Sequence, residues 1–198
     1  MSQVIELSAA APEPPVLPHR GLRLLSRALA ILFTLFVAAQ ILWVVAAGLV
    51  TIFFSDHVRV GAAGVSIYER KPPPIPGTVL YSSQSALTRA VGMADIVIAT
   101  VPILLIFWEL RGLFRLYARG IVFAQENAAL LKRVGLWLVV YPFAKFAANM
   151  LFQLAGGTDK AWFRMELVYA LVLGLIVFVI AQVMEFGREI EQEKDSFV

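Results

Sequence analysis

The sequence predicts an all-α membrane protein, a four-helix transmembrane bundle with a cytoplasmic interfacial helix-turn and a short extracytoplasmic loop. Hydrophobic residues make up 60% of the 198 residues, whereas an average soluble domain is about half apolar. Charged residues make up only 16%, against about 25% in such a domain. The apolar residues also form four long runs, each with the roughly 20 residues that a helix needs to cross the hydrocarbon core of a bilayer.

The first 27 residues are predicted to form a disordered cytoplasmic tail. Pro12, Pro14, Pro15 and Pro18 lie close together, and prolines at this density prevent helix formation. A cleavable signal peptide is not expected, because the first apolar run begins late and is longer than the apolar core of such a signal.

The transmembrane domain is predicted over residues 28–186. Its spans are expected at about residues 28–54, 91–113, 134–155 and 165–186. Pro102 lies at the middle of the second span and predicts a kink. The charged cytoplasmic tail, residues 187–198, is expected to extend the last helix, since its acids and bases lie three to four residues apart.

Two connections carry turn signals. Residues 55–90 include a run of prolines that cannot be helical, and its flanks, Val58–Tyr68 and Thr78–Tyr81, are expected to pair as a short hairpin. After the second span, Gly120 is a good position for a helix C-cap, and a new helix is expected to start near Ala124.

The distribution of basic residues predicts the orientation. With four crossings, both termini and the middle connection share one side, which carries ten Lys and Arg residues against six on the other. The positive-inside rule therefore places both termini in the cytoplasm of a multi-pass protein of the cell inner membrane.

The third span carries a strip of polar residues, Tyr141, Lys145, Asn149 and Gln153, which recur every four positions and so share one helical face. A lysine near mid-bilayer must be paired or hydrated. The strip is therefore either a polar pocket or ion path, or a row of interhelical hydrogen bonds, which is the interpretation we favour. Candidate partners for Lys145 are Glu109, Asp95, Glu185 and Gln40. Because a lysine side chain leans toward the N-terminus of its helix, Glu109 and Glu185 are preferred over Asp95.

Small residues four apart, at Ala144/Ala148 and Ala170/Gly174, permit close approach of helices. Packing within one chain is a better explanation of them than a dimer face, although a homo-oligomer remains open.

The middle connection is a candidate cytoplasmic interaction loop. Its candidate residues are Arg115, Arg119, Gly120, Phe123, Asn127, Lys132 and Arg133. The loop is basic and aromatic, which is typical of a topology determinant with aromatic anchors, and also suits anionic lipid headgroups. Direct binding of nucleic acid is not expected, because the segment is short and lies against the membrane.

No catalytic motif is present in the sequence. His19 and His57 fall on opposite sides of the membrane and cannot share a metal, and the chain has no cysteine. Patterns for a zinc protease, a phosphate-binding loop, a nucleophile elbow or a dinucleotide site are missing as well. We therefore expect no enzyme activity, no cofactor and no metal site.

The segment from Leu113 to Asn127 resembles the signature loop of the YoaS-like bacterial membrane proteins, a family of unknown function with four transmembrane helices. Its members carry a Gly, a Phe and an Asn, here Gly120, Phe123 and Asn127, followed by a short basic stretch into the next span. They commonly have Ser or Thr after the Phe, where this chain has Ala124. The resemblance implies no known activity. It does imply a helix-turn-helix regulator as a neighbour, since members are often found beside one.

Three functional hypotheses follow. The first is a non-enzymatic regulatory or sensory component that acts with a cytosolic partner, such as a helix-turn-helix transcriptional regulator, through the middle connection and the acidic tail. The second is a small transporter or ion-conducting oligomer that uses the polar strip of the third span. The third is a structural subunit of a membrane complex. The first is favoured, because of the resemblance.

Overall fold

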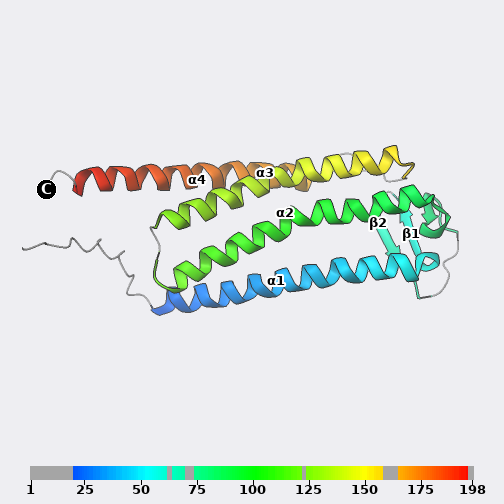
Figure 1. The fold of residues 1–198 in the computed structure, drawn as a ribbon, viewed down its shortest axis with the longest axis horizontal. Coiled ribbons are helices and arrows are strands. Elements are labelled where there is room, and N and C mark those ends of the chain that lie inside the picture. Colours follow the sequence, from blue (N-terminus) through cyan, green and yellow to red (C-terminus); the bar gives the residue numbers. More distant parts are fainter. Residues whose placement is uncertain (1–19, 62–63, 70–73, 122–123, 158–164, 196–198) are drawn as a thin grey trace, which may run out of the picture.

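The computed structural model describes residues 20–61, 64–69, 74–121, 124–157 and 165–195. Within them, four helices are long and apolar enough to cross a membrane. They are α1 (Arg20–Phe53), α2 (Ala86–Ala118), α3 (Gln125–Leu154) and α4 (Met165–Asp195) (Figure 1). At a rise of 1.5 Å per residue each is about 45 Å long or more, so each extends beyond a hydrocarbon core of about 30 Å. The predicted set of four membrane helices is confirmed.

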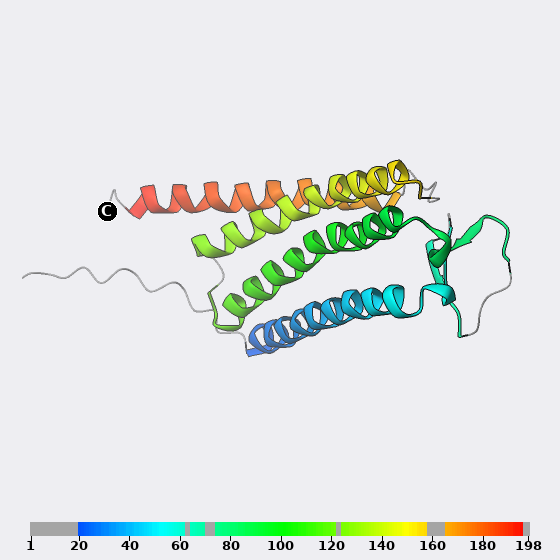
Figure 2. The same ribbon diagram turned by 45° about the vertical axis from the view of Figure 1, so that its right-hand side comes forward.

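The helices pack in chain order, α1 on α2, α2 on α3 and α3 on α4. As a result α1 and α4 lie on opposite sides of the assembly (Figures 1 and 2). Aromatic rings join α1 to α2, with the Phe36 and Phe107 centroids 5.4 Å apart and the Phe33 and Phe114 centroids 5.6 Å apart. Many large apolar side chains point outward, as expected where lipid replaces water as the solvent.

The start of α1 differs from the prediction. Helix α1 begins at Arg20, so the expectation of a disordered tail through residue 27 is wrong for residues 20–27. The prolines that break helix end at Pro18, and the arginines and leucines that follow are good helix formers. The rest of that predicted tail, residues 1–19, lies outside the described residues. At the other terminus α4 continues to Asp195, as expected for a helical extension.

The chain between α1 and α2 forms a small antiparallel sheet. Its strands are β1 (Val58–Gly61), β2 (Gly64–Ile67) and β3 (Thr78–Leu80), in the order β2-β1-β3. The two flanks pair through β1 and β3, as expected, but the hairpin of consecutive strands is β1–β2, which lies inside the first flank and was not predicted. Val58 and Val60 pack with Tyr81 and Phe152 in a buried cluster, so the sheet is fixed onto the helices. This end of the molecule is called the sheet end.

The opposite end, called the turn end, holds the connection between α2 and α3 (Figure 1). Gly120 has a positive φ of 85° and ends α2 as predicted. Its N–H donates to the Tyr117 carbonyl at 2.9 Å, and the Ile121 N–H donates to the Leu116 carbonyl at 3.1 Å. These bonds satisfy carbonyls that the end of a helix leaves without partners. Gly120 and Ile121 therefore close the C-terminal end of α2.

Candidate functional site

An ion pair between two of the candidate membrane helices joins α2 to α3. Lys145 Nζ lies 3.2 and 3.1 Å from the two carboxylate oxygens of Asp95, and both side chains are 20% exposed. The preference for Glu109 and Glu185 as partners of Lys145 is therefore wrong. Because α2 and α3 are antiparallel, Lys145 and Asp95 both lie about 30–35 Å from the turn, whereas Glu109 lies about 14 Å from it. The position of each residue along its helix therefore decides the pairing, and the direction in which the lysine side chain points does not.

The two rejected acids pair with basic residues nearer the turn. Glu185 on α4 accepts a hydrogen bond from Lys132 Nζ at 3.1 Å. Glu109 on α2 lies 3.8 Å from Arg133 Nη1. Each pair again joins residues at the same level on neighbouring helices. The three pairs link α2 to α3 and α3 to α4, which supports a structural role for these charges.

The remaining residues of the predicted polar strip lie on α3 with Lys145. Asn149 is buried, while Tyr141 and Gln153 are half-buried. The structure thus places the four residues along one helix, as the spacing predicted, with Lys145 contacting α2. A functional role of the strip, as a polar pocket or an ion path, stays a prediction.

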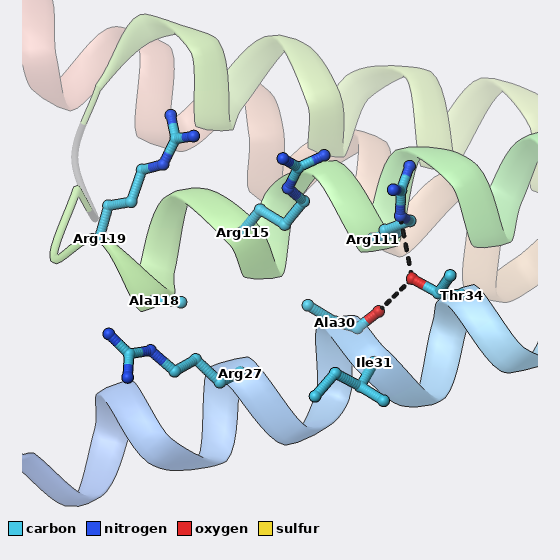
Figure 3. Close-up of a pocket in the computed structure, with 8 residues that line it drawn as sticks. All are labelled: Arg27, Ala30, Ile31, Thr34, Arg111, Arg115, Ala118 and Arg119. Carbon is cyan, nitrogen blue, oxygen red and sulfur yellow. Dashed lines mark hydrogen bonds between the residues drawn. The ribbon is translucent and has the colours of Figure 1, made fainter.

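An open groove at the turn end gathers four arginines, and we call it the arginine groove (Figure 3). It has a volume of about 440 Å³. Its lining residues are Arg27, Ala30, Ile31, Thr34, Arg111, Arg115, Ala118 and Arg119. No lining residue is acidic. The groove therefore concentrates positive charge between α1 and α2.

Arg111 is the most constrained of these arginines. Its Nε donates to Thr34 Oγ1 at 2.9 Å, and the Thr34 hydroxyl donates in turn to the Ala30 carbonyl at 2.7 Å. The guanidinium carbon also lies 4.8 Å from the centre of the Trp108 ring, in a cation–π contact. These contacts fix the guanidinium between the two helices.

A second cavity, the apolar pocket, lies at the sheet end and also has a volume of about 440 Å³. It is bounded by α1, α2, the sheet and one residue of α3. Its lining includes Trp43, Val50, Val60, Phe152 and Asp95. The size is within the range of small-molecule sites. The Lys145–Asp95 ion pair therefore adjoins the wall of a largely apolar cavity.

The comparison with protein families matches residues 72–198 to DUF2975, described as a protein of unknown function. The match covers more than half of the chain. The chain belongs to the DUF2975 family. Neither a curated protein nor a solved structure matches it. The DUF2975 match includes β3 and α2–α4, and so contains all three ion pairs, whereas Arg27 and the rest of α1 precede it.

The candidate interaction loop proves to contain residues of several kinds. Arg115 and Arg119 line the arginine groove, and Lys132 and Arg133 form ion pairs. Asn127 is fully buried, and its side-chain amide donates to the Ile121 carbonyl at 2.8 Å. Gly120 is buried as the helix cap, and Phe123 lies outside the described residues. Among these loop residues, only Arg115 and Arg119 are both exposed and without an ion pair in the described part of the chain.

Sequence reasoning missed Arg27 as a partner of the α2 arginines and missed both cavities. The spacing of Arg111, Arg115 and Arg119, four residues apart, signals a shared helical face. Nothing in the sequence indicates which part of α1 lies beside that face. Such a site depends on the register between α1 and α2, which the packing of Phe33 and Phe36 sets.

Proposed function

We propose that this DUF2975 protein is a non-enzymatic regulatory or sensory component of the inner membrane that acts with a cytosolic partner. The observation that carries the proposal is the projection of α4 at the turn end. In Figures 1 and 2 the C-terminal part of α4 extends beyond the ends of the other three helices. A helix that leaves the bundle in this way offers a surface to another protein.

The length of α4 supports this assignment. The helix has 31 residues, of which about 20 suffice to cross the bilayer. The final turns carry Glu189, Glu191, Glu193 and Asp195 against only Arg188 and Lys194. An acidic extension suits a basic partner, such as a DNA-binding regulator.

Orientation is part of the proposal. The turn end carries the N-terminal arginines of α1, the arginine groove and the basic residues of α3, and the positive-inside rule assigns such an end to the cytoplasm. Both termini would then be cytoplasmic, and the sheet would lie on the outer side.

The apolar pocket supports a sensory role more than a purely structural one. It lies at the sheet end, far from the projecting part of α4, and its size fits a small apolar molecule. The YoaS-like resemblance of the middle connection supports a helix-turn-helix regulator as the partner class. We assign no catalytic step and no cofactor to the protein.

Co-purification tests the proposal. The full chain in detergent is compared with a chain lacking residues 187–198 and with the triple variant E189Q/E191Q/E193Q, using a helix-turn-helix regulator encoded near the gene as prey. We expect capture by the full chain and a loss of about tenfold or more in both altered forms, since charge complementarity orients the encounter. The matched control is D56N/E69Q, which removes acids near the sheet and should leave capture unchanged. Failure of the full chain to bind contradicts the proposal.

The transport alternative has less support. Lys145 is paired with Asp95 within one chain, and the helices pack in sequence with α1 and α4 apart, so one chain does not surround a central path. An ion-conducting oligomer would have to form the path between copies. Liposome flux that falls with K145M would favour this alternative. A structural subunit would instead co-migrate with a larger complex in native gels.

A further inference from the structure

Four arginines line the arginine groove, and no acid is among its lining residues. Like charges repel, and the repulsion is strongest where the surroundings have a low dielectric constant. Lys132, Arg133 and Lys145 each pair with an acid of the same chain. In the described residues, Arg27, Arg111, Arg115 and Arg119 have no such pair, so the groove is complementary to an anion.

The geometry of the groove favours a phosphate. Figure 3 shows Arg111, Arg115 and Arg119 leaving one side of α2 a turn apart, while Arg27 extends along α1 on the side of α2 where Ala118 lies. Guanidinium groups bind phosphate oxygens through paired N–H donors. Because Nε of Arg111 is used by Thr34, its terminal amino groups keep their donors for a ligand, and the side chain is already fixed in place.

The depth of the groove favours a lipid as the source of that phosphate. Helix α2 is about 50 Å long, so a hydrocarbon core of about 30 Å centred on it would end near Arg111, and the three arginines span about 12 Å from that edge outward. The groove therefore runs through the layer that headgroups occupy. Ala30, Ile31 and Ala118 supply small and apolar walls beside the arginines, which suits the glycerol and the first acyl carbons of a phospholipid.

We propose that the arginine groove binds the phosphate of an anionic phospholipid headgroup. Arg115 and Arg119 contact the phosphate from α2, Arg27 adds positive charge from α1, and Arg111 closes the deep end of the groove. The inference concerns a different surface from the acidic extension of α4 and does not depend on the partner proposed for it.

Native mass spectrometry of the full chain tests the site, with dioleoyl phosphatidylglycerol as the probe and dioleoyl phosphatidylcholine as the neutral reference. We expect the chain to retain phosphatidylglycerol selectively. The variant R115Q/R119Q should weaken this retention about tenfold or more, because hydrogen bonds between charged partners are among the strongest in proteins. R115K/R119K keeps the charge but loses paired donors, and should give an intermediate value.

The matched control is R20Q/R23Q, which removes the same charge from the same end of the molecule outside the groove lining. If both double variants weaken retention equally, the attraction is general surface charge and the proposed site is wrong. Should R115Q/R119Q unfold in detergent, R27Q tests the groove from α1, where the exposed side chain has no described contact. Unchanged retention in R27Q and in R115Q/R119Q would also overturn the proposal.

Soluble competitors distinguish the source of the phosphate. Inorganic phosphate and glycerol 3-phosphate present the same chemistry without acyl chains. We expect neither to displace phosphatidylglycerol at millimolar concentration, because the apolar walls contribute only to a lipid. Displacement by either one would assign the groove to a free phosphate ligand and would overturn the lipid assignment.

Discussion

Lys145 Nζ lies within 3.2 Å of both carboxylate oxygens of Asp95, so one cation on α3 neutralises one anion on α2 inside the membrane region. Each charge without the other would remain in a medium that solvates it poorly. The two charges compensate each other only when α2 and α3 pack in this register. The pair therefore favours this register over others.

We predict that K145M lowers the free energy of unfolding by about 2 kcal/mol, and that D95N does so similarly. Loss of one partner of a buried pair costs about 3–5 kcal/mol, and the 20% exposure of these side chains reduces that penalty. The double variant D95N/K145M should recover most of the loss, because no charge is then unpaired. Denaturant titration in detergent micelles measures all three. Additive losses in the double variant would show that the pair does not couple the helices.

The Lys132–Glu185 pair gives a contrasting control, since these side chains are 39% and 38% exposed. K132M should cost less than about 1 kcal/mol, because solvent screens exposed pairs. A loss as large as that of K145M would contradict the view that burial determines the difference.

The crossing of α3 and α4 depends on two glycines. A Cβ on Gly174 would lie 2.9 Å from the Leu138 Cβ and from the Val139 backbone N, and one on Gly135 would lie 3.0 Å from the Gly174 carbonyl oxygen. This contact confirms that Gly174 packs within the chain. We predict that G174A destabilises the protein by about 1–3 kcal/mol, because the neighbours are mainly backbone. Thermal unfolding in detergent measures the effect.

Gly187 is the matched control on α4, because a Cβ there meets nothing within 4 Å. G187A should be neutral or slightly stabilising, since alanine favours helix over glycine by up to about 1 kcal/mol. Equal loss in G174A and G187A would indicate a general sensitivity of α4 and not a close crossing.

Tyr81 gives the sheet end a pH-dependent contribution. Burial raises the pKa of Tyr81 above its usual value, partly offset by the positive charge of Arg89, and the hydroxyl donates to the Arg89 carbonyl at 2.7 Å. Because the folded pKa is raised, this contribution is complete below the unfolded pKa of about 10 and is lost as pH rises through the folded pKa.

We therefore predict that Y81F costs about 1 kcal/mol at pH 8 through the lost hydrogen bond. The difference between the parent chain and Y81F should shrink above about pH 10, where only the parent titrates at this position. Unfolding measured across the pH range follows both effects. A difference that grows with alkaline pH would contradict the burial of the neutral phenol.

The start of α3 lacks a side-chain cap. Ala124 occupies the N-cap with extended backbone angles, φ −79° and ψ 155°, and forms no capping hydrogen bond. A124S should stabilise the protein by about 0.5–1 kcal/mol, because a hydroxyl there accepts from an N–H of the first turn. Thermal unfolding measures the gain. As the converse control, Ser85 caps α2 by accepting from the Thr88 N–H, so S85A should cost a similar amount. No change in either variant would mean that capping does not limit stability here.

The sequence by itself determined the four membrane helices, because a run of about 20 apolar residues has no other stable place than a bilayer. It also determined the local ends, such as the glycine cap at Gly120, and the single face shared by the polar residues of α3. These properties depend on neighbours within one or two helical turns.

Only the tertiary structure decided which charges meet. Lys145 pairs with Asp95 and not with Glu109 because antiparallel helices bring together residues at equal distances from their connection, and the reach of one side chain cannot bridge the remaining offset. Arg27 joins the arginines of α2 for the same reason, through the register of α1 on α2. Contacts between helices depend on packing across the whole bundle, which no local pattern in the sequence specifies.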